Sequence, residues 1–398
     1  MRPLCWITFL AMSLGALTAS WAGLPHARPE QVGMSTERLS RLDELITQAV
    51  AKGEIPGAVV LVMRHGHIVV HKAFGHSQLV PERKPMEKDM VFDLASITKP
   101  VATATSVMLL VEQGKLRLHD KVTTFVPEFT PFVDDKGAPA EDACVWHLLT
   151  HTSGLPPYTN ADSVARRLGR PCPTDSLVAH IAKLKKLNAP GKEFHYSCLG
   201  FITLAHIVRK VSGHRLDQFA REQIFLPLGM KSTSFCPGKE LLWRVVPTEV
   251  VDGAPLHGVV HDPLARLQGG VSGNAGLFSS AEDLAIFAQM MLNQGHYAGV
   301  RILSPLTVRL MTSVYPEAAQ SGRGLGWDIS SAYASNGGDL FAGGYGHTGY
   351  TGTSIWIDPA TDAAVILLTN RVHPKDVGSV VRLRSVVANV VAGAIVGP

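Results

Sequence analysis

A serine and a lysine three positions apart are the residues best placed to carry out chemistry in this sequence. Ser96 and Lys99 lie in the segment 92–100, and a long apolar run of helical character follows them. If a helix begins near Ser96, the two side chains share one face, about 4.5 Å apart along the axis. Pro100 requires that helix to begin nearby, because proline is tolerated only in the first turn. The spacing therefore predicts contact between a serine hydroxyl and a lysine amine.

This pair predicts nucleophilic attack on an acyl group. A serine hydroxyl is a weak nucleophile and needs a base within hydrogen-bonding distance. Lysine has an ordinary pKa near 10.4, so burial or nearby positive charge must lower it before the amine accepts a proton at neutral pH. The alternative is a helix N-cap serine followed by a surface lysine, and S-x-x-K alone does not exclude it because the motif recurs by chance.

Two further segments supply candidate site residues. One, at 194–200, places a tyrosine just before a predicted helix; the other, at 347–353, opens a C-terminal strand between glycines. Backbone N–H groups at such a strand edge can face a substrate carbonyl. The alternative for the tyrosine is a buried core side chain with a satisfied hydroxyl. The candidates in these segments are Tyr196, Cys198, His347, Thr348, Gly349 and Tyr350.

The three segments together resemble the S-x-x-K, central motif and K-T-G pattern of penicillin-binding proteins and β-lactamases. More closely, they resemble the superfamily of class C β-lactamases, DD-peptidases and esterases, whose central motif is Tyr-x-Asn. The stretches 146–156, 273–280 and 325–327 also resemble segments typical of that superfamily. The resemblance covers nearly the whole chain after residue 22.

The resemblance implies a role for each candidate. Ser96 becomes the acylated nucleophile, and Lys99 and Tyr196 the pair that shuttles its proton. The backbone N–H groups of Ser96 and Tyr350 form the oxyanion hole. His347 stands where many relatives carry lysine, so it contacts the substrate carboxylate or joins the proton network.

Two positions depart from the family pattern. Cys198 replaces the asparagine of the central motif, which removes an amide contact to the substrate and predicts weak β-lactam turnover. His347 replaces the lysine of the third motif, as in the DD-peptidase and D-aminopeptidase branches. A histidine there predicts a contact that depends on pH near neutrality. Neither change removes the acylation residues.

Hydrophobic patterning predicts an α/β (α+β) fold. Apolar runs at 57–63 and 67–74, and at 353–357 and 363–369, flank short turns and indicate two antiparallel hairpins. Helical patterns are expected at 35–52, 101–114, 199–211, 281–293 and 377–396. We therefore expect one antiparallel sheet built from both chain ends, about 30–100 and 300–398, with helices on its faces. A mainly helical lobe, about 101–299, is inserted between them, in a β-lactamase/transpeptidase-like arrangement.

Composition and motifs exclude several classes of function. The 398 residues are 46% hydrophobic and 18% charged with a net charge of +4, and no run of five like charges suggests a nucleic-acid partner. No dinucleotide or Walker motif is present, so we expect no cofactor. His147 and His151 stand four apart, but H-E-x-x-H is absent. We therefore expect no metal.

The first 22 residues have the layout of a secretory signal peptide: Arg2, an apolar stretch, then small residues around Trp21. We expect cleavage after Ala22, a single domain over 23–398, no membrane span after cleavage, and a periplasmic or secreted location. The four cysteines beyond the signal allow three disulfide pairings, or are buried free thiols. They are Cys144, Cys172, Cys198 and Cys236.

These observations predict an exported serine hydrolase that forms an acyl-enzyme on Ser96. The expected substrate is a small-molecule or peptide acyl compound, either a D-amino-acid peptide or a small ester. The alternatives are a β-lactamase with weak lactam turnover and a penicillin-binding sensor that does not turn over. The sequence leaves the oligomeric state and the preferred acyl group open.

Overall fold

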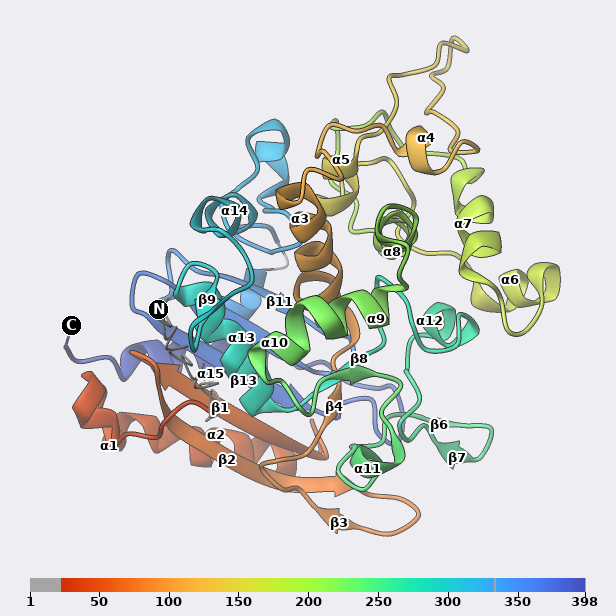
Figure 1. Ribbon diagram of the computed structural model, residues 1–398. Helices are drawn as coiled ribbons and strands as arrows, with labels where there is room; N and C mark the ends of the chain where they lie inside the picture. Colours follow the sequence, from red (N-terminus) through yellow and green to blue (C-terminus); the bar gives the residue numbers. More distant parts are fainter. Residues whose placement is uncertain (1–22, 333, 398) are drawn as a thin grey trace, which may run out of the picture.

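The computed structural model describes residues 23–332 and 334–397, and Figure 1 shows their arrangement. A six-stranded antiparallel sheet in the order β11-β12-β13-β1-β2-β3 joins the two chain ends. β1 pairs with β13, Ala58 opposite Thr369 through Arg64 opposite Ala363. Its strands are β1 (Gly57–Arg64), β2 (His67–Gln78), β3 (Lys84–Pro85), β11 (Tyr345–Thr348), β12 (Ser354–Asp358) and β13 (Ala363–Thr369).

The sequence explains why β1 and β13 lie at the middle of this sheet. Both are continuous apolar runs and are buried along their whole length, as expected for strands covered on both faces. The turn between β1 and β2 has positive φ at His65 (49°) and Gly66 (74°), which suits a tight hairpin. The two predicted hairpins are confirmed.

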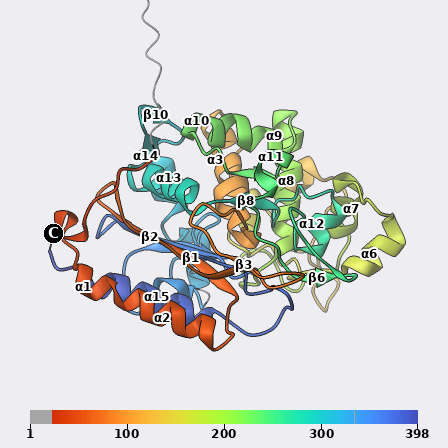
Figure 2. The same cartoon turned by 90° about the horizontal axis from the view of Figure 1, so that it is seen from below.

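Helices cover both faces of the sheet. Figure 2 shows α2 (Arg41–Ala51) and α15 (Val381–Gly393) beside each other on one side and α13 (Ala281–Leu292) on the other. The expected helix over 35–52 is divided into α1 (Thr36–Leu39) and α2, and the expected helix over 377–396 begins only at Val381. The helices expected at 199–211 and 281–293 are present, and Gly213 (φ 79°) ends the first of them.

The insertion between the sheet halves is mainly helical (Figure 1). Its helix α8 (Cys198–Ser212) is buried through ten consecutive residues. The other helices from residue 99 onward are η3 (Lys99–Ala104), α3 (Thr105–Glu112), α4 (Val122–Phe125), α5 (Val145–Leu149), α6 (Ala161–Leu168), α7 (Thr174–Ala182), α9 (Leu216–Ala220), η4 (Arg221–Phe225), α10 (Leu226–Leu228), α11 (Lys239–Leu242), α12 (Pro263–Leu267), α14 (Pro305–Met311), η5 (Pro316–Ser321) and η6 (Ala334–Gly337).

Short elements complete the chain. A three-stranded sheet in the order β4-β8-β5 lies next to the start of η2. The remaining elements are η1 (Pro29–Val32), β4 (Phe92–Asp93), η2 (Ala95–Ile97), β5 (Ser234–Phe235), β6 (Val250–Val251), β7 (Ala254–Pro255), β8 (Leu277–Ser279), β9 (His296–Tyr297) and β10 (Val300–Arg301). This small sheet carries the segment that contains Ser96.

Three predictions concern the chain outside its core. The expected signal peptide, residues 1–22, lies outside the described residues. Over 23–332 and 334–397, no helix is both long enough and apolar enough to cross a membrane. Cys144, Cys172, Cys198 and Cys236 are all free thiols, so the structure contains none of the three disulfide pairings that the sequence left open.

Candidate active site

Ser96 lies in a short turn that a buried aspartate holds in place. The residue before it, Ala95, has φ +47°, a left-handed conformation that is uncommon for a residue with a side chain. Asp93 accepts hydrogen bonds from the N–H of Ala95 at 2.9 Å and from the N–H of His261 at 2.7 Å. Burial raises the pKa of Asp93, and these two backbone donors oppose that effect. Asp93 therefore stabilises the backbone that presents Ser96.

Lys99 is buried directly beside the serine. It is the first residue of η3, with Pro100 second as expected, and its side chain has no exposed surface. Its Nζ donates to Ser96 Oγ at 2.9 Å, to the carbonyl of Asn274 at 2.9 Å and to Cys198 Sγ at 3.5 Å. The predicted contact between hydroxyl and amine is confirmed.

The charge state of Lys99 differs from the prediction. Burial alone disfavours the ammonium, but the thiol of Cys198 and the phenol of Tyr196, which also hydrogen-bonds to the amine, favour it; together they raise the pKa of Lys99. An ammonium has three N–H donors, and Ser96, Cys198, Tyr196 and the carbonyl of Asn274 all lie around this one. The expectation that burial leaves a neutral amine is therefore wrong, and Lys99 is protonated in the resting site.

Tyr196 lies among basic and aromatic side chains. Its ring centroid is 4.4 Å from that of His151, 5.1 Å from Lys99 Nζ and 5.7 Å from the guanidinium carbon of Arg323. His151 accepts a hydrogen bond from the N–H of Ser197 at 3.0 Å, and burial holds the pKa of this imidazole well below its ordinary value. The site thus brings Tyr196 to Lys99, as the sequence predicts.

His347 reaches the same site from β11. Its Nδ1 lies 2.8 Å from the carbonyl of Thr348, so Nδ1 carries the proton and Nε2 keeps its lone pair. The side chain is buried, and burial together with Arg323 holds the pKa of His347 well below its ordinary value. The predicted pH-dependent contact near neutrality is therefore wrong, because this imidazole stays neutral there.

The strand edge after His347 is fastened to the serine turn. Gly349 N–H donates to the carbonyl of Thr353 at 2.7 Å, and Thr353 Oγ1 donates to the carbonyl of Leu94 at 3.0 Å. Within residues 23–332 and 334–397, the N–H of Tyr350 has no acceptor. The Tyr350 side chain is 60% exposed and its hydroxyl donates to Asp376 at 2.6 Å. Only the backbone of Tyr350 is thus available to the serine turn.

A cavity of about 480 Å³ opens over these groups. Its lining includes Ser96, Tyr196 and the segment 347–350, together with residues 376–381 and the arginines Arg323, Arg371 and Arg384. Cys198 is not among its lining residues and instead contacts Lys99. The hydroxyl of Ser96, the phenol of Tyr196 and the backbone of Tyr350 therefore line one cavity, with the Lys99 ammonium 2.9 Å from the serine hydroxyl, which is the geometry needed for acyl transfer.

The comparison with known proteins agrees with this geometry. The model of the family described as Beta-lactamase matches residues 42–388. The chain belongs to this β-lactamase family. A protein of Salmonella agona (strain SL483), provisionally named D-alanyl-D-alanine carboxypeptidase, is 32% identical over 92% of this chain and 90% of its own. The chain is a serine hydrolase of that family.

Solved structures give the same fold. EstCE1, described as a hydrolase with promiscuous acyltransferase activity, superposes with a TM-score of 0.72, 25% identity, and coverage of 90% of this chain and 99% of its own. The octameric penicillin-binding protein homologue from Pyrococcus abyssi gives a TM-score of 0.67 and 26% identity, covering 83% of this chain and 73% of its own. The predicted fold class is confirmed.

The charged side chains that line this β-lactamase-family site were not predicted from the sequence. Arg323 forms an ion pair with Asp328 at 2.9 Å, and Arg371 with Asp376 at 2.8 Å. Arg384 lines the same cavity without a carboxylate partner in the described part of the chain. One signal could have found it: an arginine inside the otherwise apolar segment 377–396 needs a buried partner.

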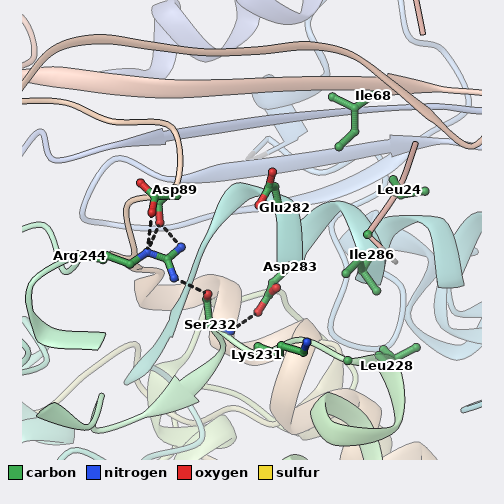
Figure 3. A pocket seen from close by; sticks show the side chains of 12 residues that line it. Leu24, Ile68, Asp89, Leu228, Lys231, Ser232, Arg244, Glu282, Asp283 and Ile286 are labelled. Carbon is green, nitrogen blue, oxygen red and sulfur yellow. Dashed lines mark hydrogen bonds and ion pairs between the residues drawn. The ribbon is translucent and has the colours of Figure 1, made fainter. Parts of the chain in front are cut away.

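A second cavity, of about 530 Å³, lies elsewhere and is shown in Figure 3. Asp89, Arg244 and Asp283 in its lining are engaged with one another's segments. Asp89 binds Arg244 at 3.0 Å, Arg244 donates to Ser232 Oγ at 3.0 Å, and Asp283 accepts from the N–H of Ser232 at 2.7 Å. These contacts hold three segments together, so the cavity at Ser96 is the candidate active site.

The two histidines spaced four apart do not form a metal site. His147 stacks on Trp146 and accepts from the N–H of Cys144, while His151 lies beside Tyr196. Among the described residues, no group of three or more histidine, cysteine, aspartate or glutamate side chains could hold a metal ion.

Proposed function

We propose that this protein is an exported acyl-enzyme hydrolase that cleaves an amide or ester bond, with a D-amino-acid peptide as its main substrate in the manner of a DD-carboxypeptidase. The observation that carries the proposal is the 2.9 Å contact between the buried Nζ of Lys99 and the Oγ of Ser96 at the floor of the cavity. A serine in that environment has both a polarising group and an open path to substrate.

The mechanism follows from the positions of the protons. Ser96 Oγ attacks the acyl carbon and gives its proton to Tyr196, which reacts as a phenolate held by the Lys99 ammonium and becomes a neutral phenol. The Lys99 ammonium stabilises the developing negative charge, and the N–H groups of Ser96 and Tyr350 receive the oxyanion. The proton returns to the leaving amine or alcohol. Water then hydrolyses the acyl-enzyme by the same path in reverse.

The charge of the cavity supports a carboxylate-terminated substrate. Three arginines line it and only two carboxylates pair with them, which leaves an excess of positive charge opposite the serine. The carboxypeptidase name of the 32% identical Salmonella protein points to the same substrate class. The layout of residues 1–22 supports export, because such substrates belong to the cell wall outside the cytoplasm.

A small ester is the second candidate substrate. Cys198 replaces the amide that relatives direct at an acylamino substrate, and its thiol is engaged by Lys99. The structural similarity to EstCE1 supports this candidate as well. A β-lactamase with weak lactam turnover and a penicillin-binding sensor that does not turn over are the remaining alternatives.

One experiment separates these candidates. Purified protein is assayed in parallel on a D-Ala-D-Ala peptide, a short-chain nitrophenyl ester and a chromogenic cephalosporin. Intact-mass spectrometry after treatment with penicillin measures the acyl adduct. The peptide is expected to be the best substrate. A stable adduct with no product from any substrate would support the sensor and refute turnover.

Variants test the residue roles. Ser96→Ala is expected to lose the adduct and about 10⁶-fold in kcat. Ser379→Ala is the matched control, because Ser379 lines the same cavity without contacting Lys99. Lys99→Ala and Tyr196→Phe are each expected to lose acylation while keeping the fold. If Ser96→Ala kept its adduct, the nucleophile would be another residue.

A further inference from the structure

We propose that Arg384 is a positioning residue that orients and polarises the Gly349–Tyr350 peptide, the unit whose N–H serves as an oxyanion donor. The inference rests on the proposed acyl-enzyme mechanism and adds to it a residue that acts on the reaction through the backbone of the strand edge. It assigns a function to the one arginine of the cavity that has no carboxylate partner.

The contacts of Arg384 are made to backbone carbonyls. Its Nη2 donates to the carbonyl of Gly349 at 2.6 Å and to the carbonyl of Thr353 at 2.9 Å. The side chain extends from the first turn of α15 and is only 8% exposed. The carbonyl of Thr353 also accepts from the N–H of Gly349. The N–H of Gly352 also donates to the carbonyl of Gly349 at 3.1 Å, so the guanidinium nitrogen reinforces the turn on which the oxyanion donor is carried.

Peptide geometry turns this contact into control of the N–H direction. The peptide is planar, and in a trans peptide the C=O and N–H bonds point to opposite sides. Since the carbonyl of Gly349 points to Arg384, the N–H of Tyr350 points away from it. That N–H has no acceptor among the described residues, and Tyr350 lines the cavity that also holds Ser96. Fixing the carbonyl therefore fixes the donor.

The positive charge of Arg384 also polarises the Gly349–Tyr350 peptide that it orients. A cation bound to a carbonyl oxygen withdraws electrons from the amide, which makes the N–H of that amide a stronger donor. Hydrogen bonds in a low-dielectric protein interior polarise one another in the same way. The positive charge of Arg384 is not neutralised by a carboxylate, and burial lowers its pKa to about 9. Arg371 donates in the same way to the carbonyl of Tyr350 at 2.7 Å but is ion-paired with Asp376. Arg384 is thus the less compensated of the two.

The test uses three variants of the full mature protein. Arg384→Met removes both bonds and the charge, Arg384→Lys keeps the charge, and Arg382→Met is the control because Arg382 is exposed on the same helix. Thermal unfolding establishes that each variant folds. For each, kcat and KM are measured on a nitrophenyl ester, and infrared difference spectroscopy measures the carbonyl stretch of the acyl-enzyme.

Arg384→Met is expected to lower kcat by about 10–100-fold, a fraction of the 10²–10³ that a whole oxyanion donor supplies, with KM within about threefold. Its acyl carbonyl stretch is expected to rise in frequency, because the hydrogen bond to the carbonyl oxygen weakens. Arg384→Lys is expected to recover part of both effects and Arg382→Met to match the wild type.

Two outcomes would overturn the proposal. A folded Arg384→Met protein with wild-type kcat would show that the guanidinium does not act on the reaction. A fall in kcat without a shift of the carbonyl stretch would show a merely structural role. If Arg384→Met does not fold, the same comparison between Arg384→Lys and wild type decides. Loss of activity in Ser96→Ala alongside either outcome would leave the acyl-enzyme mechanism intact, so the two failures are distinguishable.

Discussion

Gly349→Ala is expected to abolish most of the activity, because no space exists for one more carbon at this position. A Cβ built on Gly349 would lie far inside 3.0 Å, the closest approach that real Cβ atoms show, of both Thr353 Oγ1 and the carbonyl of Leu94. Leu94 belongs to the turn that presents Ser96. The added methyl group would thus separate the strand edge from the nucleophile.

The magnitude follows from the displacement. The clash is relieved by a shift on the order of 1 Å, and a misplacement of that size costs about 10²-fold in rate. Loss of one oxyanion donor costs about 10²–10³-fold in kcat, or about 2.7–4 kcal/mol. We therefore expect kcat to fall by about 10²–10³-fold with little change in KM. Overpacking of this kind also lowers the free energy of unfolding by about 1–3 kcal/mol.

The assay is hydrolysis of the peptide and of a nitrophenyl ester, together with the rate of penicillin labelling. Gly343→Ala is the matched control, because it makes the same change a few residues earlier with nothing within 4 Å of the new carbon. Urea unfolding shows that both variants fold. A folded Gly349→Ala protein with kcat within threefold of wild type would refute the claim that this strand edge holds an oxyanion donor.

Three further predictions follow from buried groups. Asp93→Ala removes the acceptor of two backbone N–H groups and is expected to lower the free energy of unfolding by about 2–6 kcal/mol; a loss below 1 kcal/mol in urea unfolding would contradict this. Cys198→Asn is expected to raise the rate on a chromogenic cephalosporin, and an unchanged rate would show that position 198 does not control lactam turnover. Burial lowers the pKa values of His151 and His347, so below about pH 6.5 the unfolded chain binds more protons and stability falls by about 1.4 kcal/mol per pH unit for each; equal stability at pH 7 and pH 5 would show that these imidazoles titrate normally.

Local patterning predicted the main elements and missed their breaks. Apolar alternation and turn residues located both hairpins, and helical periodicity located α8 and its end at Gly213. The break between α1 and α2 was not predicted; there the hydroxyl of Ser40 donates to the carbonyl of Glu37. α15 begins later than predicted, and the segment before it is bound by Arg371, which lies just after β13 and donates to the carbonyls of Val377 and Gly378. A contact of this kind leaves no local signal in the sequence.

Some residues of the candidate site could be predicted from local sequence, and others could not. Ser96 and Lys99 were found from their spacing alone, because one turn brings them together. Tyr196 and Tyr350 came from the resemblance to a family, since their approach depends on the folded chain. The charge states of Lys99 and His347 were predicted wrongly, because they depend on burial and on neighbours that are distant in sequence. Arg384 was not predicted, because its carbonyl partners lie more than thirty residues away in the sequence.

The departures from the family motifs leave the acylation geometry unchanged for a reason visible in the contacts. The oxyanion donors are backbone groups, and what holds them is Asp93 beneath Ala95, Thr353 against Leu94, and the guanidinium over Gly349. None of these contacts involves the side chains at positions 198 and 347. Substitution at those two positions therefore leaves the support of the oxyanion donors in place, whereas substitution of the supporting residues displaces the donors themselves.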